Sequence, residues 1–167
     1  MPHTSSSARK PKLPMLIGGG VALAAALLTR LAVGTPVTAI HKFEAFLSLP
    51  PIWFMGLLWL ASFALTGAFA GELLSSPCLN PRDEALAWRG ATALVLALVF
   101  SLVWYTLLFG KCFLLASWLC LLLSAVAAVW CALSWLQVKR GVSLVMFGFF
   151  LWQMILFFLQ LAVLLHA

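Results

Sequence analysis

The sequence contains very few charged residues. Only 8% of its 167 residues are charged, Asp and Glu together number four, and 65% of the chain is apolar. A soluble globular domain is about a quarter charged and about half apolar, so soluble and intrinsically disordered proteins are excluded. The ten Lys and Arg residues are scattered, so the net charge of +6 creates no patch for a nucleic acid. A polytopic membrane protein without a separate soluble domain remains.

Metal-binding and acid–base groups are also scarce. The four cysteines include no CxxC pair, and the three histidines lie near chain ends or in a loop, so no metal site is expected. Cys112, Cys120 and Cys131 lie in or beside apolar runs, where we expect them to pack as small hydrophobic residues. The near-absence of ionisable groups within these runs argues against an ion-coupled transporter and against a catalytic triad or carboxylate pair.

Five apolar segments are long enough to cross a bilayer, which takes about 20 residues. They cover roughly residues 13–33, 52–73, 88–109, 112–136 and 141–165. We therefore predict an all-α integral membrane protein, a single bundle of five transmembrane helices, preceded by a disordered basic tail at residues 1–12. The short third and fourth connections predict antiparallel neighbours.

The first two connections carry helix signals. Apolar residues recur at helical spacing in the first, which predicts a short interfacial helix; they are Ala39, Phe43, Phe46 and Leu47. The prolines at 50–51 are expected to start the next span. Asn80 is expected to cap the approach to the third span, with Asp83 and Glu84 in its first turn.

The distribution of Lys and Arg predicts the orientation. With the N-terminus inside, the inner face holds Arg9, Lys10, Lys12, Arg82, Arg89, Lys139 and Arg140, and the outer face holds Arg30, Lys42 and Lys111. We therefore predict a cytoplasmic N-terminus, an external C-terminus and an external first loop. The absence of a presequence favours a bacterial inner membrane.

Tryptophan is abundant, with eight residues. Trp53, Trp88 and Trp135 suit the interfacial belt of a membrane protein. The others fall a turn or more inside their spans: Trp59, Trp104, Trp118, Trp130 and Trp152. These either fill space between helices or form the wall of a pocket for a flat, apolar, conjugated ligand.

A few small or polar residues stand out within the spans. Gln153 and Gln160 are seven residues apart and so share a helix face, and Ser101 precedes Trp104 by three residues. They either form interhelical hydrogen bonds or orient a ligand. The glycines at 18–20 would permit close helix packing, within the chain or between two copies.

Several motifs resemble those of the tryptophan-rich sensory proteins, the TspO/MBR family, whose mitochondrial members are the translocator protein or peripheral benzodiazepine receptor. The PPxW…W…Y…G signature is similar to residues 50–54 (PPIWF) followed by Trp59, Phe63 and Gly67. The family's W-x-x-x-F-F-G resembles residues 104–110 (WYTLLFG).

In the last span, residues 151–160 (LWQMILFFLQ) resemble the family's L-W-x-x-F-A-x-x-L-N. The landmarks keep family order from Pro50 to the C-terminus. The chain departs from the pattern where the K-P-x-W before the double proline is absent, and where Ser101 and Gln160 replace two asparagines.

The resemblance implies a five-helix bundle, usually a homodimer, with a pocket open toward the first loop. Family members bind protoporphyrin IX, haem, cholesterol and synthetic benzodiazepine-type ligands, and no cofactor is required. By position, the candidate ligand-binding residues are Trp59, Phe63, Ser101, Trp104, Trp152, Leu159 and Gln160. Porphyrin propionates would need cations near the mouth, for which Lys42, Arg30 and His41 are the candidates.

The first functional hypothesis is therefore a membrane receptor or sensor for tetrapyrroles or sterol-like ligands. A second is a porphyrin-degrading enzyme, since Trp59 and Trp152 match the tryptophans associated with light- and oxygen-dependent breakdown in some bacterial members. A third is a structural or assembly subunit without a ligand, and a fourth is passive transport of small apolar molecules.

Overall fold

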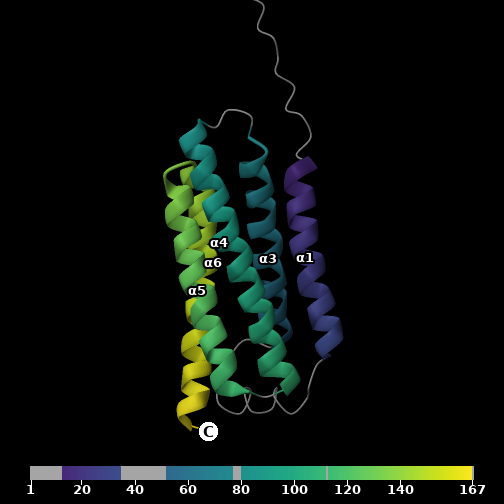
Figure 1. Ribbon diagram of the computed structural model, residues 1–167. Helices are drawn as coiled ribbons and strands as arrows, with labels where there is room; N and C mark the ends of the chain where they lie inside the picture. The colour runs from purple at the N-terminus through teal and green to yellow at the C-terminus, as the bar shows by residue number, and fades with distance from the viewer. Residues whose placement is uncertain (1–12, 35–51, 77–79, 112, 167) are drawn as a thin grey trace, which may run out of the picture.

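A computed structural model describes residues 13–34, 52–76, 80–111 and 113–166. Their helices are α1 (Leu13–Val33), α3 (Ile52–Leu74), α4 (Pro81–Tyr105), a π-helical turn η1 (Thr106–Gly110), α5 (Leu114–Leu136) and α6 (Arg140–His166). The long helices lie side by side in one bundle (Figure 1). Among the described residues, five helical segments are long and apolar enough to cross a membrane. The predicted all-α integral membrane fold is confirmed.

The helix bounds follow the prediction closely, except in α4. This helix begins at Pro81 rather than at residue 88, with Asn80 at its N-cap and with Asp83 and Glu84 in the first turn. The Asn80 side chain makes no capping hydrogen bond. Proline at the first position and acidic residues near the positive end of the helix dipole extend α4 beyond its apolar stretch.

Some predictions concern parts of the chain outside the described residues. These are the tail at 1–12, the first connection with its interfacial segment and the candidate cations His41 and Lys42, the prolines at 50–51, and Cys78 and Cys112. The side chain of Trp53 is likewise outside the description. The described cysteines, Cys120 and Cys131, are free, and Cys131 is buried as predicted.

Helix α1 packs against α3 through small residues. A Cβ added at Gly18 would overlap the carbonyl of Gly67, and one at Gly67 would overlap both the Gly18 carbonyl and Ala22. This close approach is typical of small-residue helix contacts in membranes. Gly18 and Gly19 therefore serve packing within the chain, whereas nothing lies near Gly20.

The other extensive helix contacts join α4 to α5 and α5 to α6. Buried residues form one cluster toward the C-terminal end of α3 and a second around Trp59 and Trp104. Trp135 belongs to the first cluster and is 0% exposed, so its predicted interfacial position is wrong. Gly90 leaves room for its indole, whose Nε1 donates to the carbonyl of Ala87 at 3.0 Å.

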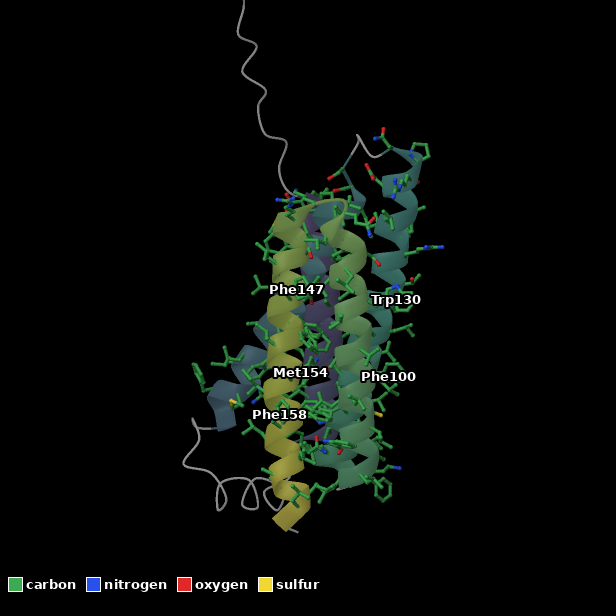
Figure 2. All side chains as sticks on the ribbon, turned by 90° about the vertical axis from the view of Figure 1, so that its left-hand side faces the viewer. Phe100, Trp130, Phe147, Met154 and Phe158 are labelled. Carbon is green, nitrogen blue, oxygen red and sulfur yellow. The ribbon has the colours of Figure 1, made fainter. Side chains whose placement is uncertain are left out.

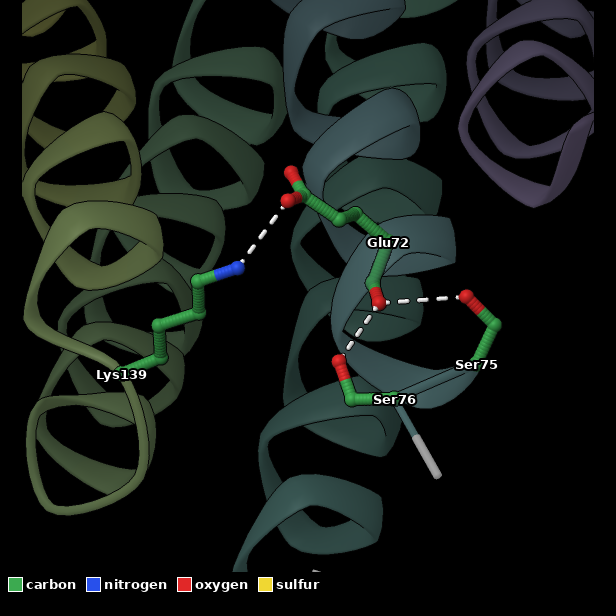
Figure 3. Close-up of polar contacts among 4 residues, drawn as sticks. All are labelled: Glu72, Ser75, Ser76 and Lys139. Carbon is green, nitrogen blue, oxygen red and sulfur yellow. Dashed lines mark hydrogen bonds and ion pairs between the residues drawn. The ribbon is translucent and has the colours of Figure 1, made fainter. Parts of the chain in front are cut away.

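An ion pair joins α3 to the connection between α5 and α6 (Figure 3). The Lys139 Nζ lies 3.0 Å from a Glu72 carboxylate oxygen. The main-chain carbonyl of Glu72 also accepts hydrogen bonds from the Ser75 and Ser76 hydroxyls. These contacts place the end of α3 and the α5–α6 connection at the same end of the bundle, as five alternating helices require.

Candidate ligand site between α3, α4 and α6

Three helices meet at one buried hydroxyl. The Nε1 of Trp59 in α3 donates to the Oγ of Ser101 in α4 at 3.1 Å. The Nε2 of Gln153 in α6 donates to the same oxygen at 3.1 Å. All three side chains are buried. The interhelical hydrogen bonding predicted for the polar residues of the spans is therefore present.

The indole of Trp59 lies within an aromatic group. It stacks on Tyr105 with a centroid distance of 4.7 Å and an interplanar angle of 17°. The ring centroid of Phe63 lies 4.8 Å from that of Trp59, and the ring centroid of Phe109 lies 4.7 Å from that of Tyr105. Such stacked and tilted pairs stabilise a cluster beyond simple burial. We call Trp59, Phe63, Trp104, Tyr105, Phe109 and Trp152 the aromatic cluster.

A second buried hydrogen bond joins Trp104 of the aromatic cluster to Gln160 of α6. The Nε1 of Trp104 donates to the Oε1 of Gln160 at 2.7 Å. The Gln160 Nε2 in turn donates to the carbonyl of Leu114 at 2.9 Å and to the hydroxyl of Ser117. Gln160 thus joins α4, α5 and α6. Because Gln153 and Gln160 are both buried, their predicted placement on one helix face is confirmed.

Two neighbouring residues of α6 have buried polar atoms without a hydrogen-bond partner in the described part of the chain. They are the Nε1 of Trp152, a donor, and the Oε1 of Gln153, an acceptor. Trp152 packs against the cluster that contains Trp59 and Trp104. An unsatisfied polar group in the apolar part of a membrane costs several kcal/mol. A polar group of a ligand that bonded to either atom would remove this cost.

The structure brings together most of the predicted site residues. Trp59, Phe63, Trp104 and Trp152 belong to one cluster of packed residues. The other predicted members behave differently: Ser101 and Gln160 provide hydrogen-bond partners for two of the indoles. Leu159 is half-buried and belongs to neither of the clusters found among the described residues.

Sequence reasoning missed several contributors. Tyr105 lies inside the matched WYTLLFG motif but was not expected to line the site, although it stacks on Trp59. Gln153 was predicted to form an interhelical hydrogen bond or to orient a ligand, but it was not among the candidate ligand-binding residues. From α5, Trp118 stacks on Phe157 at 4.8 Å, and its buried Nε1 also lacks a partner within the described residues. The regular spacing of polar residues was the available signal for Gln153.

Two tryptophans lie outside the site. Trp130 was expected either to pack between helices or to line a pocket, and this is wrong because its side chain is 64% exposed on α5 (Figure 2). Its neighbour Cys131 faces the core instead. Trp88 is 57% exposed in the second turn of α4, and its interfacial position stays a prediction.

The π-helical turn η1 immediately follows Tyr105. The Thr106 hydroxyl donates to the carbonyl of Leu102 at 3.0 Å, and the Phe113 amide donates to the carbonyl of Leu107. Single π-helical turns are frequent at functional sites, because the extra residue changes the direction of neighbouring side chains. Here the turn contributes Phe109 to the aromatic cluster.

Comparisons with family models, curated proteins and solved structures find no match. No group of three or more His, Cys, Asp or Glu side chains suited to a metal ion occurs among the described residues. The resemblance to the tryptophan-rich sensory proteins stays a prediction that rests on its motifs.

Proposed function

We propose that this protein is a membrane receptor or sensor of the TspO/MBR type, which binds a flat, largely apolar ligand at the aromatic cluster. A tetrapyrrole such as protoporphyrin IX or haem is the first candidate, and a sterol-like molecule is the second. The observation that carries the proposal is the pair of unpartnered buried atoms, Trp152 Nε1 and Gln153 Oε1, beside this cluster.

The chemistry of a metal-free tetrapyrrole suits these groups. Its wide aromatic plane can stack on indole and phenol rings, and its propionic acid groups carry oxygen acceptors and, when protonated, a hydroxyl donor. Gln153 Oε1 needs a donor and Trp152 Nε1 needs an acceptor. Haem would be held by its faces, since no histidine lies in the middle of a described helix.

A titration with protoporphyrin IX in the dark tests this function. Tryptophan fluorescence of the detergent-purified protein is expected to show saturable quenching. Trp152→Ala removes a stacking ring and an indole donor, so it should weaken binding about tenfold. Trp130→Ala is the matched control, because it removes an exposed indole on α5. Absence of saturable quenching, or equal weakening in both variants, would contradict the proposal.

One observation favours a second candidate, a structural or assembly subunit. The N–H donors of Trp59 and Trp104 are already bound within the chain, and Gln160 is satisfied at both ends of its amide. These contacts could serve helix packing alone. A purely structural role predicts neither quenching nor a rise in the melting temperature when protoporphyrin IX is added.

We also propose an orientation, with the N-terminus in the cytoplasm of a bacterial inner membrane, and a homodimeric state. Lys139 and Arg140 would then face the cytoplasm, while Lys111 would face outward. In a chain with its native cysteines replaced, Gly110→Cys should react with an impermeant maleimide in intact cells, and Ser76→Cys should not. The reverse labelling would overturn this orientation.

Cross-linking in native membranes tests the dimer.

A further inference from the structure

Arg30 differs from the other cations of the described chain. It lies in the last turn of α1 and is half-buried, whereas Arg82, Arg89, Lys111 and the cations at 139–140 are exposed. A cation in the last turn suits the helix dipole, but the dipole gives no reason for partial burial of the guanidinium. Long cationic side chains near the end of a span ordinarily extend into water.

The guanidinium of Arg30 is directed at α3. Its Nη1 lies 2.9 Å from the position that a Cβ on Gly56 would occupy, so Gly56 provides the space for it. Gly56 lies three residues, about one helical turn, before Trp59 in α3. The cation therefore lies at the border of the aromatic cluster.

Within the described residues, no acidic side chain pairs with this cation. The acidic residues there are Glu72, Asp83 and Glu84, at the end of α3 and in the first turn of α4. Both places are at the opposite end of the bundle from the last turn of α1 (Figure 1). Glu72 is moreover paired with Lys139. A partly buried cation is costly near a membrane unless an anion pairs with it, and no acidic side chain of the described residues does so.

We propose that Arg30 binds the anionic group of the ligand and so selects flat amphiphilic acids over neutral sterols. This inference rests on the proposed function, since it concerns the same site. A guanidinium can hold a carboxylate through two parallel hydrogen bonds. A ligand carboxylate and a lipid phosphate share this chemistry. The direction of the guanidinium, toward Gly56 and the aromatic cluster, favours a carboxylate attached to the ring system.

The test compares protoporphyrin IX with its uncharged dimethyl ester in a non-ionic detergent. The wild-type protein should bind the diacid about tenfold more tightly than the ester, because a hydrogen bond to a charged group is among the stronger ones. Arg30→Gln should remove this preference while leaving the affinity for the ester unchanged. Arg30→Lys should retain part of it. Lys111→Gln removes an exposed cation at the same end and should leave the preference intact.

The outcomes separate this inference from the function on which it rests. Equal binding of acid and ester by the wild-type protein, or a preference that survives Arg30→Gln, overturns the role of Arg30 and leaves the ligand site standing. A fall in wild-type diacid affinity to that of the ester on addition of phosphatidylglycerol would assign Arg30 to lipid phosphate instead. If neither porphyrin binds, the proposed function fails as well.

Discussion

At the scale of single residues, the tryptophans differ in the partner of the indole N–H. Trp59, Trp104 and Trp135 donate to acceptors on other helices. Trp118 and Trp152 have buried N–H groups without a partner in the described chain. The position of a tryptophan along its span does not predict its environment. Trp135 lies near the end of α5, where an exposed interfacial residue was expected, and it is fully buried. Trp135 can be buried because the carbonyl of Ala87 accepts its N–H and because Gly90 leaves space for the indole.

Gln160 should be important for stability. Gln160→Leu removes hydrogen bonds to Trp104, Leu114 and Ser117. Interhelical hydrogen bonds in membranes contribute about 0.6 kcal/mol on average, so the total loss should be about 1–2 kcal/mol. Unfolding in mixed micelles measures it. Gln137→Leu is the control, because Gln137 is exposed at the end of α5. Equal stability of the two variants would show that the Gln160 contacts are not stabilising.

Residue-level features were predictable only where spacing determines them. The seven-residue interval placed Gln153 and Gln160 on one buried face. The stacking of Tyr105 on Trp59 was not predictable, because it depends on how α3 meets α4 and on the π-helical turn after Tyr105. The exposure of Trp130 likewise depends on which face of α5 meets its neighbours.

At the scale of whole helices, length and hydropathy were sufficient to predict the spans, while polar helix ends were harder. The seven residues that α4 gains beyond its predicted start at 88 include three charged residues and only one large apolar residue, Leu86, so an apolar run does not include them. Helix pairing needed the structure. The glycines at 18–20 left open whether α1 contacts its own chain or a second copy. The structure shows that Gly18 and Gly19 contact α3 of the same chain.

The packing of α1 on α3 should be sensitive to small increases in side-chain size. Gly67→Ala places a methyl group against the Gly18 carbonyl and Ala22, and overpacking of this kind costs about 1–3 kcal/mol. Gly20→Ala adds the same group where nothing lies nearby. Thermal unfolding in detergent should show a lower melting temperature for Gly67→Ala alone. A similar melting temperature for both variants would contradict the close contact.

At the scale of the molecule, the aromatic cluster lies where the α1–α3 pair meets α4, α5 and α6. Trp59 bonds to Ser101 across this boundary, and Glu72 pairs with Lys139 across it at one end. The ion pair is partly exposed, so its contribution is at most about 1 kcal/mol. The buried contacts around Trp59 therefore carry most of the specific polar connection between the two groups of helices. A ligand bound there would contact both groups.

Indole N–H spectra of the protein with 15N-labelled tryptophan test the central claim most directly, because each tryptophan gives one signal that a Trp→Phe variant can assign. On addition of protoporphyrin IX in the dark, the signals of Trp59 and Trp152 are predicted to shift and saturate together. Those of the exposed Trp88 and Trp130 should stay unchanged. Shifts confined to the exposed tryptophans, or no shift at any position, would contradict a ligand site at the aromatic cluster.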